Sequence, residues 1–212
     1  MSDEYPSQYG TPARFLCAFI ALIAVAAISF RVVIRMDELG GALPALSFLT
    51  QFFTILTNGL VCLAMILIVF GVQFGPRFLM AITISIVAVG IIYHVALSHL
   101  VEFTGLELLA DHAVHTAVPT LTLLWWLAFA PKRSFSPSDI ITWTAWPLMY
   151  CVYILFRASF SGFYPYPFLN LPELGVSGLV TSTAVLSLAF IVMGFGLLGL
   201  SRMVGTRERA TG

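Results

Sequence analysis

Long runs of apolar residues are the feature that most limits what this chain can fold into. A transmembrane helix needs about 20 mostly apolar residues, and six stretches meet that requirement: 15–34, 46–70, 78–98, 107–130, 139–160 and 175–200. Runs such as LVCLAMILIVF do not alternate between apolar and polar residues, as strands of a membrane barrel would. Because backbone groups in lipid must pair within their own helix, the sequence predicts an all-α polytopic membrane protein. Six transmembrane helices are expected in one bundle, and residues 1–212 in one domain.

Charged residues are scarce, and their positions predict how the chain sits in the membrane. They make up 9% of the chain, against about a quarter of a soluble domain. The ten basic and ten acidic residues cancel, so the chain lacks the positive field that nucleic-acid binding requires. Seven of the basic residues fall on the side that holds both termini: Arg14, Arg77, Lys132, Arg133, Arg202, Arg207 and Arg209. Basic residues favour the cytoplasmic side, so both termini are predicted to be cytoplasmic. The tryptophans near the inner helix ends are expected to be interface anchors: Trp125, Trp126, Trp143 and Trp146.

The ionisable residues within or at the ends of these helices gather toward the outer side. They are Arg31, His94, His99, Asp111, His112, His115 and Arg157. A charge in the membrane interior costs at least about 2.5 kcal/mol, so their gathering indicates a hydrated cavity open to the outside. For those nearest the helix ends, the alternative is a position at the lipid headgroups. The last outer loop, SGFYPYPFLNLPELG, is stiff and apolar, and it suits either a lid over an acyl-chain entrance or an ordinary interfacial loop.

The fourth predicted helix contains DHAVHTAVP, in which Asp111 and His115 are four residues apart and share a face. Asp111 is then able to hold one ring nitrogen of His115 and leave the other free as a base. A carboxylate has this orienting role in a catalytic triad. Pro119 cannot donate a hydrogen bond to the His115 carbonyl, so a kink is expected there.

The second predicted helix contains QFFTILTN, which places Thr54 and Asn58 one turn apart. Thr54 and His115 each lie eight residues into their spans, about 12 Å from the outer end at about 1.5 Å per residue, so we expect them to meet. A histidine that takes its proton makes a threonine hydroxyl a nucleophile, and Asn58 offers an amide donor for an oxyanion. The alternative is that both polar residues form structural hydrogen bonds between helices.

Two other functions remain open at this point. One is a zinc-dependent hydrolase, with the metal bound by His94, Asp111, His112 and His115. The other is a non-enzymatic transporter or proton relay, which would use the same ionisable groups. However, the inner halves of the second, third and sixth predicted helices hold no charge to continue such a path.

Three segments together resemble a known family. QFFTILTN, DHAVHTAVPTLTLLWW and GFYPYPFLNL are similar to segments of the six-helix membrane proteins that include the androgen-induced protein and the androgen-dependent regulator of tissue-factor-pathway inhibitor. The likeness covers nearly the whole chain and is that of a bacterial relative. It implies the bacterial inner membrane, with the polar site on the outer side. The animal members hydrolyse fatty acid esters of hydroxy fatty acids with a threonine nucleophile and a histidine.

The resemblance implies roles for particular residues. Thr54 of FFT is the implied nucleophile and His115 of HAVHT the implied base, and the family's YPF motif matches residues 166–168 or overlaps 164–165. Asp111 stands where the animal members do not keep an acid, so its orienting role rests on spacing alone. The residues predicted to bind the lipid ester are Arg31, His94, His112, Arg157, Tyr164 and Tyr166, and either arginine suits a free carboxylate. The expected partners are the bilayer and the ester, with no metal and no other cofactor.

Overall fold

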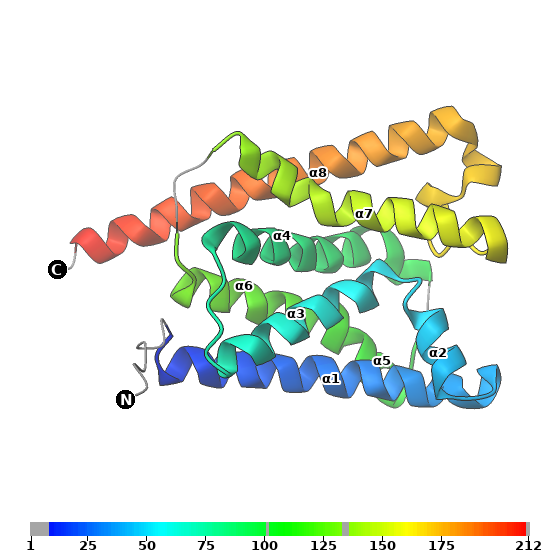
Figure 1. Cartoon of the computed structure of the whole chain (residues 1–212), viewed down its shortest axis with the longest axis horizontal. Coiled ribbons are helices and arrows are strands. Elements are labelled where there is room, and N and C mark those ends of the chain that lie inside the picture. Colours follow the sequence, from blue (N-terminus) through cyan, green and yellow to red (C-terminus); the bar gives the residue numbers. More distant parts are fainter. Residues whose placement is uncertain (1–8, 101, 133–135, 211–212) are drawn as a thin grey trace, which may run out of the picture.

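The long helices run back and forth along one axis of the bundle (Figure 1). The first, α1 (Thr11–Leu39), begins at the end of the bundle where the last, α8 (Leu171–Ala210), finishes. The computed structural model describes residues 9–100, 102–132 and 136–210, with side chains described as far as Met203. Every regular element in these ranges is helical, which confirms the all-α class. The elements are α1 (Thr11–Leu39), α2 (Ala42–Leu49), α3 (Phe53–Val69), α4 (Pro76–Ile92), η1 (Tyr93–Leu97), η2 (Ser98–Leu100), α5 (Gly105–His112), η3 (Ala113–Ala117), α6 (Val118–Phe129), α7 (Ser138–Ser161), η4 (Pro167–Leu169) and α8 (Leu171–Ala210).

Within the described ranges, four helices are long and apolar enough to cross a membrane. They are Thr11–Leu39, Pro76–Leu100, Ser138–Ser161 and Leu171–Met203. The pair α2 and α3 adds a fifth if it counts as one bent span. The predicted span 107–130 coincides with α5, η3 and α6, where a π turn divides the helix into short α-helical pieces. The structure therefore shows a membrane protein with four or five such helices, whereas six were predicted.

The predicted continuous helix 46–70 is wrong, because α2 and α3 meet at 101° across residues 50–52. Gly40 ends α1 in the left-handed region at φ 78°, which a glycine adopts without strain. The chain then enters α2, whose last carbonyls need partners outside the helix. Arg157 of α7 donates to one of them, the Ser47 carbonyl, at 2.6 Å, and also to Thr50 Oγ1 at 3.0 Å. The Tyr150 hydroxyl donates to the Gln51 carbonyl at 2.7 Å. The break is thus built by residues about 100 positions away.

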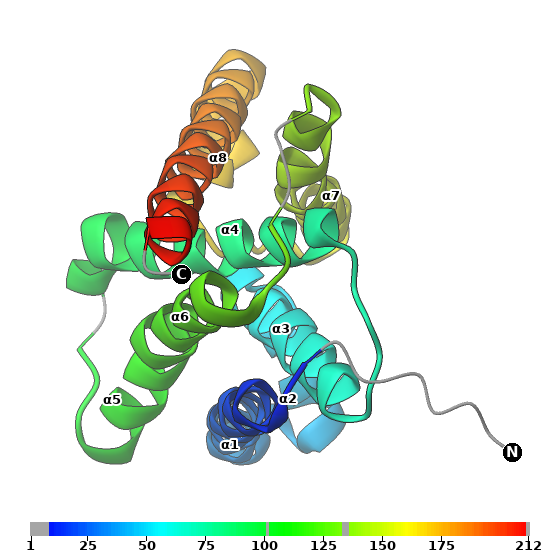
Figure 2. The same cartoon turned by 90° about the vertical axis from the view of Figure 1, so that its left-hand side faces the viewer.

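Helix α4 is the centre of the bundle. Figure 2 shows it between the α7–α8 pair and the group formed by α1, α3 and α6. Of the residues in its most apolar stretch, 61% are buried within the protein, against 22–28% for α1, α7 and α8, so these three helices lie at the outside of the bundle.

The expectation of interfacial tryptophans is wrong for three of the four. Trp125, Trp126 and Trp143 are buried in the core, and Trp125 Nε1 donates to the Ala13 carbonyl at 3.1 Å. For Trp125, the Ala13 carbonyl satisfies the indole N–H, so its apolar area is buried between helices without loss of a hydrogen bond. Of the basic residues used for the orientation, Arg133 lies outside the described residues, as do the side chains of Arg207 and Arg209.

Candidate functional site

Thr54 occupies the first turn of α3, directly after the break between α2 and α3. The sequence analysis placed Thr54 about 12 Å from the outer end of its span by assuming an unbroken helix from residue 46. That assumption is wrong. The break nevertheless brings Thr54 to the polar residues of α1 and α5. Phe52 precedes α3 in an extended conformation, so the first N–H groups of α3 have no partner within their own helix. The Thr54 hydroxyl therefore lies beside the positive end of a helix dipole.

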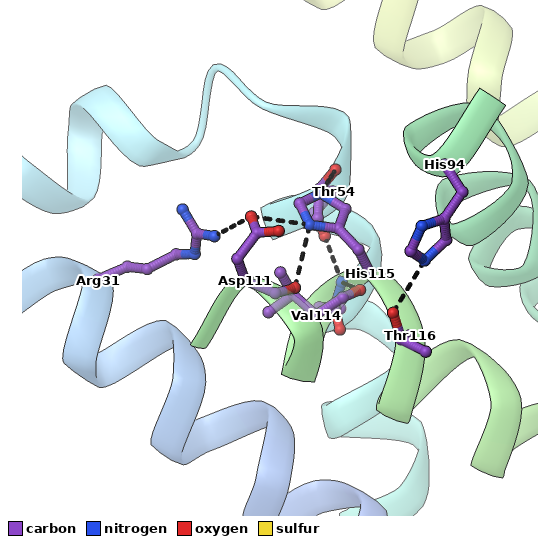
Figure 3. Close-up of polar contacts among 8 residues, drawn as sticks. Arg31, Thr54, His94, Asp111, Val114, His115 and Thr116 are labelled. Atoms are coloured by element: carbon purple, nitrogen blue, oxygen red, sulfur yellow. Dashed lines mark hydrogen bonds and ion pairs between the residues drawn. The ribbon is translucent and has the colours of Figure 1, made fainter. Parts of the chain in front are cut away.

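A chain of polar contacts runs from Thr54 to α1 (Figure 3). Thr54 Oγ1 lies 3.3 Å from His115 Nε2. His115 Nδ1 lies 3.1 Å from the Asp111 backbone oxygen and 3.1 Å from its Oδ1. Both of these atoms are acceptors, so Nδ1 carries the ring proton and Nε2 presents its lone pair to Thr54. The predicted meeting of Thr54 with His115, and of His115 with Asp111, is what the structure shows.

Asp111 is held from its other side by Arg31. Arg31 Nη2 donates to Asp111 Oδ1 at 2.6 Å, and the Asp111 side chain is only 1% exposed. A carboxylate this deeply buried needs an opposite charge to remain ionised. Arg31 also lies over the Phe103 ring, 5.4 Å from its centroid. The four groups Thr54, His115, Asp111 and Arg31 form one connected series, which we call the relay.

Two π turns frame the relay, and the sequence did not predict them. His115 lies in η3, where the Val118 N–H bonds to the Ala113 carbonyl five residues back. Pro119 follows and has no N–H, so the expected disturbance of the helix takes the form of a π turn. A π turn is rare and often marks a functional position. Across from it, Tyr93 of η1 stacks on the His115 ring with centroids 3.8 Å apart and planes 9° apart. Tyr93 thus fixes the plane of the imidazole.

Gly90 allows α4 to pack closely against η3. A methyl group at this position would lie 3.0 Å from the His115 carbonyl oxygen and 3.3 Å from Pro119 Cβ. A side chain there would push the two helices apart and move the histidine. The sequence pattern gave no signal for this contact.

Asn58 is present beside the relay but is not free to act on a substrate. Its Nδ2 donates to the Thr54 carbonyl at 2.8 Å and to the Val114 carbonyl at 3.1 Å. Both amide protons are therefore used, and Asn58 joins α3 to η3 behind the reactive groups. This geometry favours the structural alternative over the oxyanion role that the sequence suggested.

Tyr166 is the polar group that does reach Thr54. Its hydroxyl accepts the Phe53 N–H at 3.1 Å, at the start of α3. Burial raises the pKa of Tyr166 above its usual value, while hydrogen bonds with Thr54 and with the Phe53 backbone oppose that rise. The hydroxyl consequently stays protonated and is available as a donor beside Thr54. The Tyr166 ring stacks on Phe168, with centroids 5.0 Å apart.

A cavity of about 290 Å³ lies over the relay. Its walls include Arg31, Asp111, His115 and Thr54, and the loop before α8 closes it with Pro165, Tyr166 and Pro167. Arg35, which the sequence analysis did not single out, lines the same cavity and pairs with Glu38. Figure 3 shows the Asp111 carboxylate between the His115 ring and the Arg31 guanidinium.

The structure does not bring the other predicted binding residues to the cavity. Arg157 is engaged with α2, and His94 Nε2 lies 2.9 Å from Thr116 Oγ1. His112 lines a separate groove beside α1, and Tyr164 is not among the residues that line the cavity over the relay. Among these residues, no group of three His, Cys, Asp or Glu side chains is close enough to hold a metal ion. The proposed zinc ligands are therefore not assembled.

Comparisons of this chain with family models, with curated proteins and with solved structures found no match. The function is argued below from the site and from the sequence motifs.

Proposed function

We propose that this chain is a membrane-embedded hydrolase of lipid esters, with Thr54 as nucleophile and His115 as general base. The observation that carries the proposal is the orientation of His115, whose Nε2 lies 3.3 Å from the Thr54 hydroxyl while Asp111 holds Nδ1. A weak hydroxyl nucleophile needs a base at this distance. The buried carboxylate stabilises the imidazolium that forms when the base takes the proton.

In the proposed mechanism, Thr54 Oγ1 attacks the ester carbonyl carbon and its proton passes to His115 Nε2. The carbon–oxygen bond to the alcohol then breaks, and His115 returns the proton to the leaving oxygen. A water molecule, deprotonated by the same histidine, hydrolyses the acyl-threonine and releases a carboxylic acid. The sum is ester plus water giving acid plus alcohol. Arg31 supports the step by keeping Asp111 ionised and in place.

The oxyanion of the tetrahedral intermediate needs a donor that is not already used. Tyr166 meets this condition better than Asn58, because its hydroxyl accepts the Phe53 N–H at the positive end of α3, whereas Asn58 Nδ2 already donates to two carbonyls. A donor aimed at developing charge in a site shielded from water is a large contribution to catalysis. We therefore assign Tyr166 the oxyanion role.

The proposed substrates are fatty acid esters of hydroxy fatty acids, or esters of similar build. Such a molecule carries a free carboxylate, and the cavity wall includes Arg35, whose side chain is 42% exposed. The resemblance in the FFT, HAVHT and YPF segments supports the same class. We further propose that α5, η3 and α6 make one crossing, giving six spans with both termini in the cytoplasm. The site then opens at the outer face of a bacterial inner membrane.

The test is hydrolysis of a defined fatty acid ester of a hydroxy fatty acid by the purified protein in nanodiscs. Thr54→Ala and His115→Ala are each expected to abolish release of the fatty acid. Matched controls are Thr181→Ala and His99→Ala, whose side chains are exposed and line no part of the cavity. Activity that survives either relay variant contradicts the mechanism. Activity that disappears with a zinc chelator would favour the metal alternative instead.

A further inference from the structure

Thr54 lies at the junction of two cavities, and only one of them contains the relay. The second cavity, of about 50 Å³, lies between α3, α4, α7 and α8. Thr54 and Tyr166 line both cavities, so the reactive hydroxyl has a different environment on each side. We call the second space the apolar arm.

Charge is divided sharply between the two cavities. The cavity over the relay has Arg31, Arg35 and Asp111 in its walls, whereas no Asp, Glu, Lys, Arg or His lines the apolar arm. Its walls are mainly hydrocarbon and aromatic rings, such as Phe53 and Phe190. A hydrocarbon chain loses no hydrogen bonds on entering such a space and gains about 0.8 kcal/mol for each methylene removed from water.

The chemistry of the relay sets which part of an ester goes to which side. The leaving oxygen must take its proton from His115, which lines only the cavity over the relay. The alcohol part of the ester therefore departs on that side. The acyl part, which stays attached to Thr54 after the first step, has to occupy the other side.

The outer end of the apolar arm reaches the lipid-facing surface. Leu148 of α7 is 39% exposed, and the α8 residues Thr183, Leu186 and Ser187 are half-buried. Both helices lie at the outside of the bundle. Above the arm, Tyr166, Phe168 and Leu169 cover it from the side of the outer loop. The most exposed part of its wall therefore belongs to α7 and α8, not to the outer loop.

We propose that the apolar arm is the acyl-chain subsite, and that the acyl chain slides into it sideways from the bilayer between α7 and α8. This inference rests on the proposed hydrolase function, since it uses the orientation of the ester at Thr54. The difference between the two cavities would also determine which esters the protein hydrolyses. At about 50 Å³, the narrow arm holds only the acyl carbons nearest the ester carbonyl, and the rest of an unbranched chain extends into the bilayer. The larger charged cavity receives the alcohol part with its polar group.

The first test narrows the arm with a matched pair of leucines on α8. Leu186→Trp places an indole in the arm, and Leu188→Trp places one on the lipid face, where Leu188 is 60% exposed. For Leu186→Trp, we expect kcat/KM for a long-chain acyl ester to fall on the order of tenfold or more. Hydrolysis of the acetyl ester of the same alcohol should be unchanged, which also shows that the variant folds. Leu188→Trp should leave both rates unchanged. Equal effects of the two variants, or an equal loss for both esters, would overturn the assignment.

A second measurement separates failure of the arm from failure of the hydrolase. A long-chain ester with a diazirine on its acyl chain is photo-crosslinked to the Thr54→Ala variant in nanodiscs, and the adduct is located by mass spectrometry. Adducts are expected at Cys151, Thr183 or Ser187, and the added Leu186→Trp substitution should remove them. If these adducts form but the unaltered protein hydrolyses no ester, the arm stands and the hydrolase proposal fails. If the adducts lie instead in the groove between α1 and α6, the proposed route is wrong.

Discussion

Arg31→Met is predicted to destabilise the protein far more than the same change at Arg35. Arg31 donates to the Asp111 carboxylate at 2.6 Å, and that carboxylate is 1% exposed. Removing one partner of a buried ion pair leaves an uncompensated charge and costs about 3–5 kcal/mol. Arg35 pairs with Glu38, and these side chains are 42% and 57% exposed. An exposed pair of this kind contributes at most about 1 kcal/mol.

The assay is thermal unfolding of the purified variants in one detergent. A loss of 3 kcal/mol lowers the Tm of a chain of this size by about 6–12 °C, whereas Arg35→Met should lower it by no more than about 4 °C. Adding Asp111→Asn to Arg31→Met removes the unpaired charge, so the double variant should recover about 2 kcal/mol of the loss. Equal stability of the two arginine variants, or additive losses in the double variant, would refute the reasoning.

Three further substitutions test the surroundings of the relay. Gly90→Ala should cost about 1–3 kcal/mol by overpacking and slow hydrolysis, whereas Gly59→Ala, which meets no atom within 4 Å, should leave unfolding unaffected or stabilise the helix. Tyr166→Phe should lower kcat by about 10²–10³, as expected for loss of one oxyanion donor, with no matching rise in KM; an unchanged kcat removes the assigned role. Tyr93→Ala should lower kcat because the His115 ring loses the stacked surface at 3.8 Å, while Tyr93→Phe should retain most activity. Calorimetry and initial-rate kinetics on the same preparations measure all three.

The local part of the site could be predicted from the sequence. Asp111 and His115 are one helical turn apart, so their contact needs only a helix, and the π turn between them did not separate the side chains. The helical class likewise followed from the apolar runs. Each of these predictions depended on residues close together in the chain.

The features of the site that the sequence analysis predicted wrongly or missed depend on contacts between residues far apart in the sequence. The break before Thr54 falls within an apolar run that has no proline or glycine between residues 46 and 58, and it is held by Arg157 and Tyr150 of α7. Asn58 could not be assigned from its type, because the two carbonyls that take its protons come from α3 and η3. Tyr93 is an ordinary aromatic residue in its own segment, and its importance appears only when η1 packs against η3.

The most direct test of the Thr54–His115 pair is covalent labelling with a fluorophosphonate, located by mass spectrometry on the intact protein. Attack by Thr54 on the phosphorus requires the same proton transfer to His115 as attack on an ester. A single adduct at Thr54 is predicted in the unaltered protein, and it should be lost in both Thr54→Ala and His115→Ala. An adduct at another residue, or one at Thr54 that forms equally well without His115, would contradict the assignment of Thr54 and His115 as nucleophile and base.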